Sequence, residues 1–191
     1  MTPTELSKDL VREFVLSSHF NFDKVKTLLA EHPALLNAAW EWAPGDLEDG
    51  LGAAAHVGNR PIAEFLLAQG APLTICAAAM LGQREAVADF LQRDPAAVNA
   101  RGAHGISLLF HAAMSGDTTL TDFLLAQGGG EGASHALHGA IAHEQVGMVA
   151  WLLAHGANDV NTPNYEGKTP LQKAEEGGQA EIADLLRAHG A

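Results

Sequence analysis

One helix ending recurs along this chain, and it limits the folds that the sequence can adopt. The segments AEFLLAQGA, TDFLLAQGG, VAWLLAHGA and IADLLRAHGA begin at positions 63, 121, 149 and 182. Two further copies, KTLLAEHPALLNA (26–38) and ADFLQRDPAAVNA (88–100), continue into a proline where the others have a glycine. Each copy carries apolar residues at helical spacing, and glycine readily adopts the left-handed conformation that ends a helix. A tandem repeat of this kind predicts a stack of similar units.

A shorter helical run precedes each of these endings. Three of the runs, GAAAHVGN (52–59), CAAAMLGQ (76–83) and FHAAMSGD (110–117), contain small residues side by side. The distance between packed helices depends on the side chains at the contact, so small residues favour close approach. In the last copy, Thr169 can cap the first helix and Pro170 stands where no backbone N–H is needed. The chain therefore reads as about six helix-turn-helix units.

These units resemble the ankyrin repeat family. The best copy is KTPLQKAEEGGQAEIADLLRAHGA (168–191), which contains the Thr-Pro-Leu of the ankyrin core motif. GISLLFHAAMSGDTTLTDFLLAQGG and LGAAAHVGNRPIAEFLLAQGA are also clear copies, and the resemblance covers almost the whole chain. It implies a single all-α ankyrin-like solenoid. The predicted units are residues 1–36, 37–72, 73–98, 99–130, 131–158 and 159–191.

The spacing of the helix ends departs from the regular ankyrin period of about 33 residues. The second helices end at His32, Gly70, Asp94, Gly128, Gly156 and Gly190, which are 38, 24, 34, 28 and 34 positions apart. Two inter-repeat turns are therefore shortened. Long connections remain at 37–49, 98–107 and 157–169, where we expect three hairpin-like fingers.

Charge and composition exclude several classes of partner. The net charge is -12, and the 11 Lys and Arg residues do not cluster, so neither nucleic acid nor an anionic membrane is expected as a partner. No apolar run approaches the length of a membrane span, and the charged N-terminal segment lacks the apolar core of a signal peptide. A single cysteine, Cys76, excludes an intrachain disulfide. We expect a cytoplasmic monomer.

The ankyrin resemblance implies that partner proteins bind on the concave side, which the first helices and the fingers form. At its centre Val57, Met80, Leu81 and Met114 would make an apolar patch. Methionine adapts to varied partners, although some of these side chains could instead pack against the next unit or under a finger. The acidic charge favours a partner with a basic surface. The candidate partner-binding residues are Trp40, Trp42, His56, Val57, Met80, Leu81, His104, His111, Met114, Ser115, His143, Tyr165, Lys173 and Glu176.

Two tryptophans lie in the first predicted finger, NAAWEWAPGD. Trp40 and Trp42 are one residue apart, so both point to the same side of an extended strand. Exposed tryptophan is a common interface anchor, but one or both could instead hold the finger onto the second unit. The acids that follow, Asp46, Glu48 and Asp49, are expected to be solvated.

Histidine is abundant, with 10 residues, and raises the question of a metal. His135, His138 and His143 fall in or near one helix, but a zinc site needs three or four ligands that converge. His138 stands where the ankyrin motif usually has a histidine with a structural hydrogen bond. We therefore expect neither a metal nor a cofactor.

Catalysis has little support in the sequence. The rival hypothesis is a metal-binding or small hydrolytic enzyme that uses Cys76, His111 and His143, and a pocket that unites these side chains would favour it. Cys76 opens a predicted helix, where a thiolate can be stabilised, although a lone cysteine is more often a small buried residue. A third hypothesis is a scaffold that self-associates through the apolar patch. We expect a non-catalytic interaction module.

Overall fold

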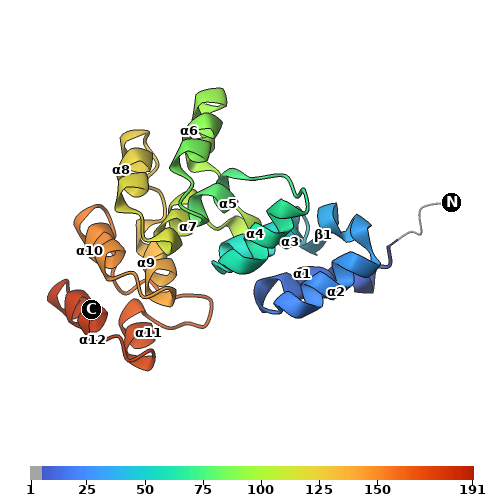
Figure 1. Cartoon of the computed structure of the whole chain (residues 1–191). Coiled ribbons are helices and arrows are strands. Elements are labelled where there is room, and N and C mark those ends of the chain that lie inside the picture. Colours follow the sequence, from blue (N-terminus) through green and yellow to red (C-terminus); the bar gives the residue numbers. More distant parts are fainter. Residues whose placement is uncertain (1–5) are drawn as a thin grey trace.

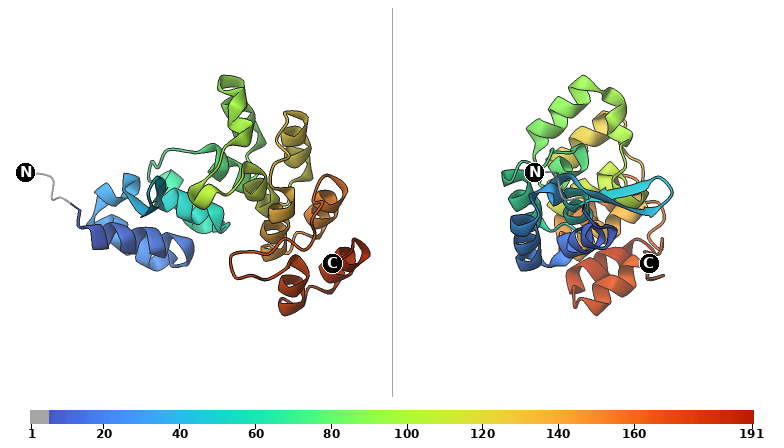
Figure 2. Two further views of the ribbon diagram at one scale, coloured as in Figure 1. Left: turned by 180° about the vertical axis from the view of Figure 1, so that it is seen from behind. Right: turned by 90° about the vertical axis from the view of Figure 1, so that its right-hand side faces the viewer.

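The computed structural model describes residues 6–191, which form an elongated, curved stack of helices with the first and last helices at its two ends (Figures 1 and 2). Within these residues, twelve α-helices pack as six consecutive pairs. The pairs are α1 (Lys8–Phe20) with α2 (Phe22–Glu31), α3 (Gly50–His56) with α4 (Arg60–Ala68), α5 (Ile75–Met80) with α6 (Arg84–Arg93), α7 (Leu108–Ser115) with α8 (Thr118–Ala126), α9 (Ala133–Ala142) with α10 (Val146–Ala154), and α11 (Pro170–Glu176) with α12 (Ala180–Ala188). The first helices of successive pairs contact one another and form an inner row.

Local sequence explains where these helices begin and end. The Thr169 hydroxyl accepts a hydrogen bond from the backbone N–H of Gln172, whose side chain in turn accepts one from the backbone N–H of Thr169. This reciprocal capping satisfies two donors at the start of α11. At the other end of a helix, Gly116 has φ 75° and ends α7. This left-handed conformation favours glycine, and a Cβ atom there would lie 2.2 Å from Oε1 of Gln145, so the Gln145 side chain would have to move.

Buried alanines let the inner helices approach closely, as the small pairs predict. Ala54, Ala78, Ala79 and Ala112 are fully buried in the hydrophobic core. The largest fully buried side chains include Leu51, Leu108 and Leu137 of first helices and Ile62, Leu120 and Leu152 of second helices. No helix within residues 6–191 has both the length and the apolar character that a membrane crossing needs.

The first long connection is a β-hairpin, which confirms the hairpin-like finger predicted at 37–49 and makes the fold mostly, but not entirely, α-helical. Strands β1 (Ala39–Ala43) and β2 (Asp46–Asp49) pair antiparallel, with Ala39 opposite Asp49 and a register shift between Glu41 and Ala43. The alternation of AWEWA suits a strand that has one face against the protein. Gly45, with φ 84°, allows the tight turn between the strands.

The other two long connections are built differently, so the three predicted fingers are not alike. The second contains the 3-10 turns η2 (Pro95–Asn99) and η3 (Ala103–Gly105) and a single bridge between Arg101 and Ser107. The third is closed by a hydrogen bond from the Asn164 N–H to the Lys168 carbonyl. Within the described chain, only the first connection has paired strands. The short turns after α4 and α8 run directly into the next helix, as predicted.

Candidate functional site

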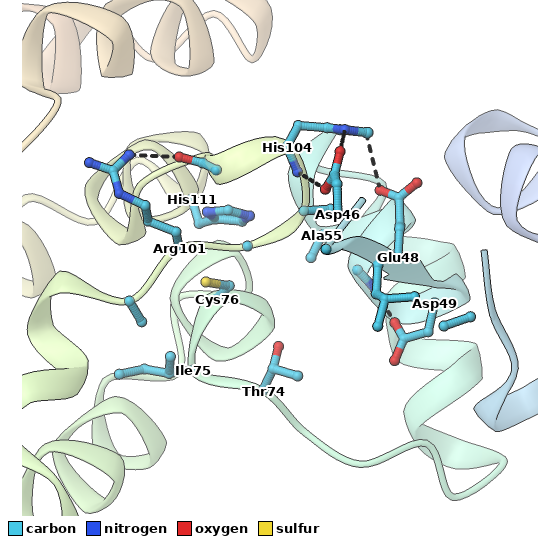
Figure 3. Close-up of a pocket in the computed structure, with 18 of the residues that line it drawn as sticks. Asp46, Glu48, Asp49, Ala55, Thr74, Ile75, Cys76, Arg101, His104 and His111 are labelled. Carbon is cyan, nitrogen blue, oxygen red and sulfur yellow. Dashed lines mark hydrogen bonds and ion pairs between the residues drawn. The ribbon is translucent and has the colours of Figure 1, made fainter. Parts of the chain in front are cut away.

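An open cleft of about 920 Å³ lies between the β-hairpin and the second connection (Figure 3). Residues 44–49 of the hairpin form one wall and residues 100–105 form the other. Thr74, Ile75 and Cys76 at the start of α5, together with His111 of α7, line the space between them. The cleft therefore depends on three successive units of the stack.

Glu48 of β2 is buried beside this cleft, with only 1% of its surface exposed. The neighbouring Leu47 is 61% exposed, so the strand turns an acid inward and an apolar residue outward. This arrangement inverts the usual pattern of a strand on a protein surface. A buried carboxylate without partners costs several kcal/mol, so the groups around Glu48 must compensate it.

Three histidines from separate elements surround this carboxylate. Nε2 of His19, near the end of α1, lies 3.6 Å from Glu48 Oε2. Nδ1 of His56, at the end of α3, lies 2.7 Å from Glu48 Oε1, and Nε2 of His104, in η3, lies 3.8 Å from the same oxygen. The ring of His56 is edge-on to both others, with centroid separations of 4.8 Å to His19 and 5.1 Å to His104. We call these four residues the Glu48 cluster.

Hydrogen bonds fix two of the rings. Nδ1 of His19 lies 3.0 Å from the Val15 carbonyl oxygen and 3.2 Å from that of Leu16. Nδ1 of His104 lies 2.8 Å from Asp46 Oδ2, and the His104 backbone N–H donates to Asp46 Oδ1 at 2.8 Å (Figure 3). His104 has φ 57°, a conformation that few residues other than glycine adopt. Asp46 thus holds the strained His104 in place through both the backbone N–H and the ring of His104.

Two buried polar atoms of the Glu48 cluster have no hydrogen-bond partner. Glu48 Oε2 accepts a hydrogen bond of 2.7 Å from the indole N–H of Trp42. Glu48 Oε1 and His56 Nδ1 are 2.7 Å apart, yet their contact lacks the alignment of a hydrogen bond, and neither buried atom has another hydrogen-bond partner. Buried polar atoms in native structures nearly always have partners, so this pair needs an explanation.

The surroundings shift the pKa values of these groups. Burial raises the pKa of Glu48, but the contact with His56, the indole N–H of Trp42 and the charge of His19 outweigh it, so the net pKa lies below its ordinary value. Burial also lowers the pKa of His19, against the opposing effect of Glu48. The His104 backbone N–H lowers the pKa of Asp46. Both acids therefore stay ionised at neutral pH, in a site that three imidazoles share.

The expected apolar patch is wrong. Met80, Leu81 and Met114 are all buried in the core between the inner helices, and only Val57, 37% exposed, reaches the surface. The inner helices are short and have a neighbour on each side, so their apolar side chains pack against adjacent units instead of facing solvent.

The residues of the rival enzyme hypothesis do not form one site. Cys76 and His111 both line the cleft, but Nε2 of His143 lies elsewhere, 3.2 Å from the Val57 carbonyl oxygen. Burial raises the pKa of Cys76 to about 11 and lowers that of His111 to about 4. Both side chains are therefore neutral near pH 7, and the thiolate–imidazolium pair of a cysteine nucleophile is not formed.

The tryptophans of the hairpin are half-buried and hold it in place. Trp42 donates to Glu48, and Trp40 packs against the first hydrophobic cluster, with the Arg12 guanidinium 6.0 Å from its ring centroid.

His138 of α9 is also buried, and its Nε2 lies 2.9 Å from the Thr162 carbonyl oxygen. This is the structural hydrogen bond that the ankyrin resemblance implies.

The other candidate contact residues lie outside the core. Ser115 is half-buried, and its hydroxyl donates to the Ala112 carbonyl at 2.7 Å. Tyr165 is 95% exposed in the third connection. Lys173 and Glu176 on α11 belong to a surface ion-pair network, with Lys173 Nζ lying 3.6 Å from Glu176 Oε2.

The Glu48 cluster is not among the sequence-based predictions. Those predictions place the hairpin acids in solvent, and the metal ligands they weigh are His135, His138 and His143, or Cys76, His111 and His143. The alternation of side chains along a strand could have indicated the burial of Glu48, because neighbouring residues such as Leu47 and Glu48 point to opposite faces. Nothing in the sequence pattern joins His19, His56 and His104, because three different units carry them.

The fold and the comparisons agree on the class of protein, which is a helical repeat protein. Residues 109–191 match the family described as ankyrin repeats, with three copies. This part of the chain therefore consists of ankyrin repeats, as the sequence resemblance predicts, and such repeats are generally protein–protein interaction modules. No curated protein matches the chain.

Proposed function

We propose that this protein is a non-catalytic interaction module that binds a partner protein through its concave face and its connecting loops. The observation that carries the proposal is the exposure of large apolar side chains on two of these loops. Leu47 is 61% exposed on the hairpin and Tyr165 is 95% exposed on the third connection. Interface cores are enriched in aromatic residues, and a few such anchors supply most of the binding energy.

The charges around the cleft favour a partner segment with basic side chains. Asp46, Glu48 and Asp49 line the cleft, while Arg101, the one lysine or arginine among the described residues that line it, is paired with Glu131. The whole chain has a net charge of -12. Charge complementarity of this kind accelerates association and selects partners, and it weakens as salt concentration rises.

The proposed surface keeps the candidate residues that the structure leaves accessible. These are Val57, His104, Ser115, His143, Tyr165, Lys173 and Glu176. We also propose that each helix pair is one unit, with boundaries at residues 1–36, 37–72, 73–98, 99–130, 131–158 and 159–191. Residues 1–5 of the first unit lie outside the part that the structure describes.

The test begins by identifying the partner through the surface in question. A photo-crosslinking amino acid at position 47 captures what the hairpin touches in native extract, and mass spectrometry identifies it. The affinity of the purified partner is then measured for the wild type, Leu47→Asp and Tyr165→Ala. The matched control is Leu125→Asp, because Leu125 is 37% exposed on α8, which belongs neither to the hairpin nor to the third connection.

We expect the two loop variants to weaken binding by about 30-fold, the effect of losing one interface hot spot, and the control to bind as the wild type does. Affinity should also fall as salt concentration rises. Full affinity in both loop variants would contradict the proposal. A wild-type chain whose mass rises with concentration, and which captures only itself, would favour the self-associating scaffold.

A further inference from the structure

We propose that the Glu48 cluster is a binding site for one divalent transition-metal ion of the zinc type. Its ligands would be His19 Nε2, His56 Nδ1, His104 Nε2 and a carboxylate oxygen of Glu48. The site shares His104 and Glu48 with the proposed partner surface and cleft, but ion binding is measured on the purified chain without a partner, so the two proposals are tested separately.

The separations of the ligand atoms suit such an ion. The ligand atoms of His19, Glu48 and His56 all lie within 4.8 Å of one another. Around a tetrahedral zinc with bonds of about 2.0–2.2 Å, neighbouring ligand atoms are about 3.4 Å apart. Nε2 of His19 lies 3.6 Å from Glu48 Oε2 and Nε2 of His104 lies 3.8 Å from Glu48 Oε1, and both distances are close to this value. The contact to His56, 2.7 Å, would lengthen slightly as an ion enters.

The tautomers of two histidines are already those of metal ligands. A backbone carbonyl only accepts hydrogen bonds, so Nδ1 of His19 carries the proton and its Nε2 presents a lone pair toward Glu48. The ionised carboxylate of Asp46 fixes His104 in the same way. A carboxylate or carbonyl behind each imidazole is the usual second shell of a protein metal site.

An ion also accounts for the unused polar atoms. A polar atom that is buried without a partner costs free energy. Glu48 is 1% exposed, and its Oε1 and the His56 Nδ1 have no hydrogen-bond partner. A divalent cation would satisfy both atoms at once.

The mixture of ligands selects the type of ion. Imidazole nitrogen suits zinc, copper, iron and nickel, whereas calcium and magnesium take mainly oxygen ligands. The site would also join four segments that are separate in sequence, namely the ends of α1 and α3, the hairpin and the second connection. The strained backbone of His104 (φ 57°) lies at this junction, where strain is often retained for function.

The test uses the untagged full-length chain, stripped with a chelator and titrated with Zn²⁺ alone against a chromophoric competitor. We expect one equivalent to bind, and Co²⁺ to show the intense visible bands of tetrahedral coordination. Glu48→Gln and His56→Asn should each weaken zinc binding by about 100-fold or more. Asp46→Asn, which removes only the group that orients His104, should weaken it by about 10–100-fold.

The matched control is His135→Asn, which removes an exposed histidine from α9 and should leave zinc affinity unchanged. If circular dichroism shows that Glu48→Gln does not fold, His104→Asn and Asp46→Asn decide the matter, because both positions lie nearer the surface. Asparagine also tolerates the left-handed backbone of position 104. The proposal is overturned if the wild type binds no stoichiometric zinc, or if the cluster variants bind it as tightly as His135→Asn does.

Discussion

His111 makes the stability of this protein depend on pH, and the size of the effect follows from its burial. The side chain is 1% exposed on α7, and its Nδ1 lies 2.9 Å from the Ser107 carbonyl oxygen. Burial lowers the pKa of His111 to about 4, against the opposing effect of the Ser107 hydrogen bond. In the unfolded chain, a histidine has a pKa of about 6.5.

Proton linkage determines whether acid raises or lowers the free energy of unfolding. Because the folded pKa is lower, the contribution of His111 to stability is fully present above pH 6.5 and is lost as pH falls toward 4. The whole shift corresponds to about 3 kcal/mol, and lowering the pH from 7 to 5 removes about 2 kcal/mol of it.

The assay compares the wild type with His111→Gln, which keeps a side-chain amide donor and cannot titrate. Urea unfolding at pH 7 and pH 5, with a chelator present, should show about 2 kcal/mol more acid sensitivity in the wild type. An NMR titration of the His111 ring protons gives the pKa directly. A measured pKa near 6.5, or equal acid sensitivity in the two proteins, would refute the reasoning.

Three other predictions concern the packing. Ala112→Leu places a larger side chain where Ala112 is fully buried, and should lower the free energy of unfolding by about 1–3 kcal/mol; unfolding that matches the wild type would refute the close approach of the inner helices. Phe14→Ala empties a fully buried position of α1 and should cost about 3–5 kcal/mol in the same assay, whereas a loss below 1 kcal/mol would mean that this end of the stack is loosely packed. Cys76, whose pKa burial raises to about 11, should react with a thiol reagent about 100-fold more slowly in the native protein than in urea, and equal rates would show that it is accessible.

The helix pairs could be predicted from the sequence because their signals are local. Apolar spacing, a capping threonine such as Thr169 and a terminating glycine such as Gly116 act within a single unit. The small pairs likewise became buried contacts between inner helices, as at Ala78 and Ala112. Each of these signals repeats along the chain, so the copies support one another.

The site could not be predicted in the same way, because it depends on contacts between units. His19, His56 and His104 meet only when three units stack, and Glu48 joins them because the hairpin register turns it inward. The prediction of an exposed apolar patch was wrong because it also left out contacts between units. An inner helix such as the one that carries Met80 has a neighbouring unit on each side. A side chain that the sequence pattern places on the surface of its own unit is therefore buried by the next unit.

The proposed metal site in the Glu48 cluster lies where the first two fingers meet the stack. Anomalous scattering at the zinc edge, from crystals of the untagged chain grown with zinc, tests it most directly. We predict one dominant peak, about 2.0–2.2 Å from His19 Nε2, His56 Nδ1, His104 Nε2 and a Glu48 oxygen. A map without density there, or with its only peaks on surface histidines such as His135, would contradict the claim.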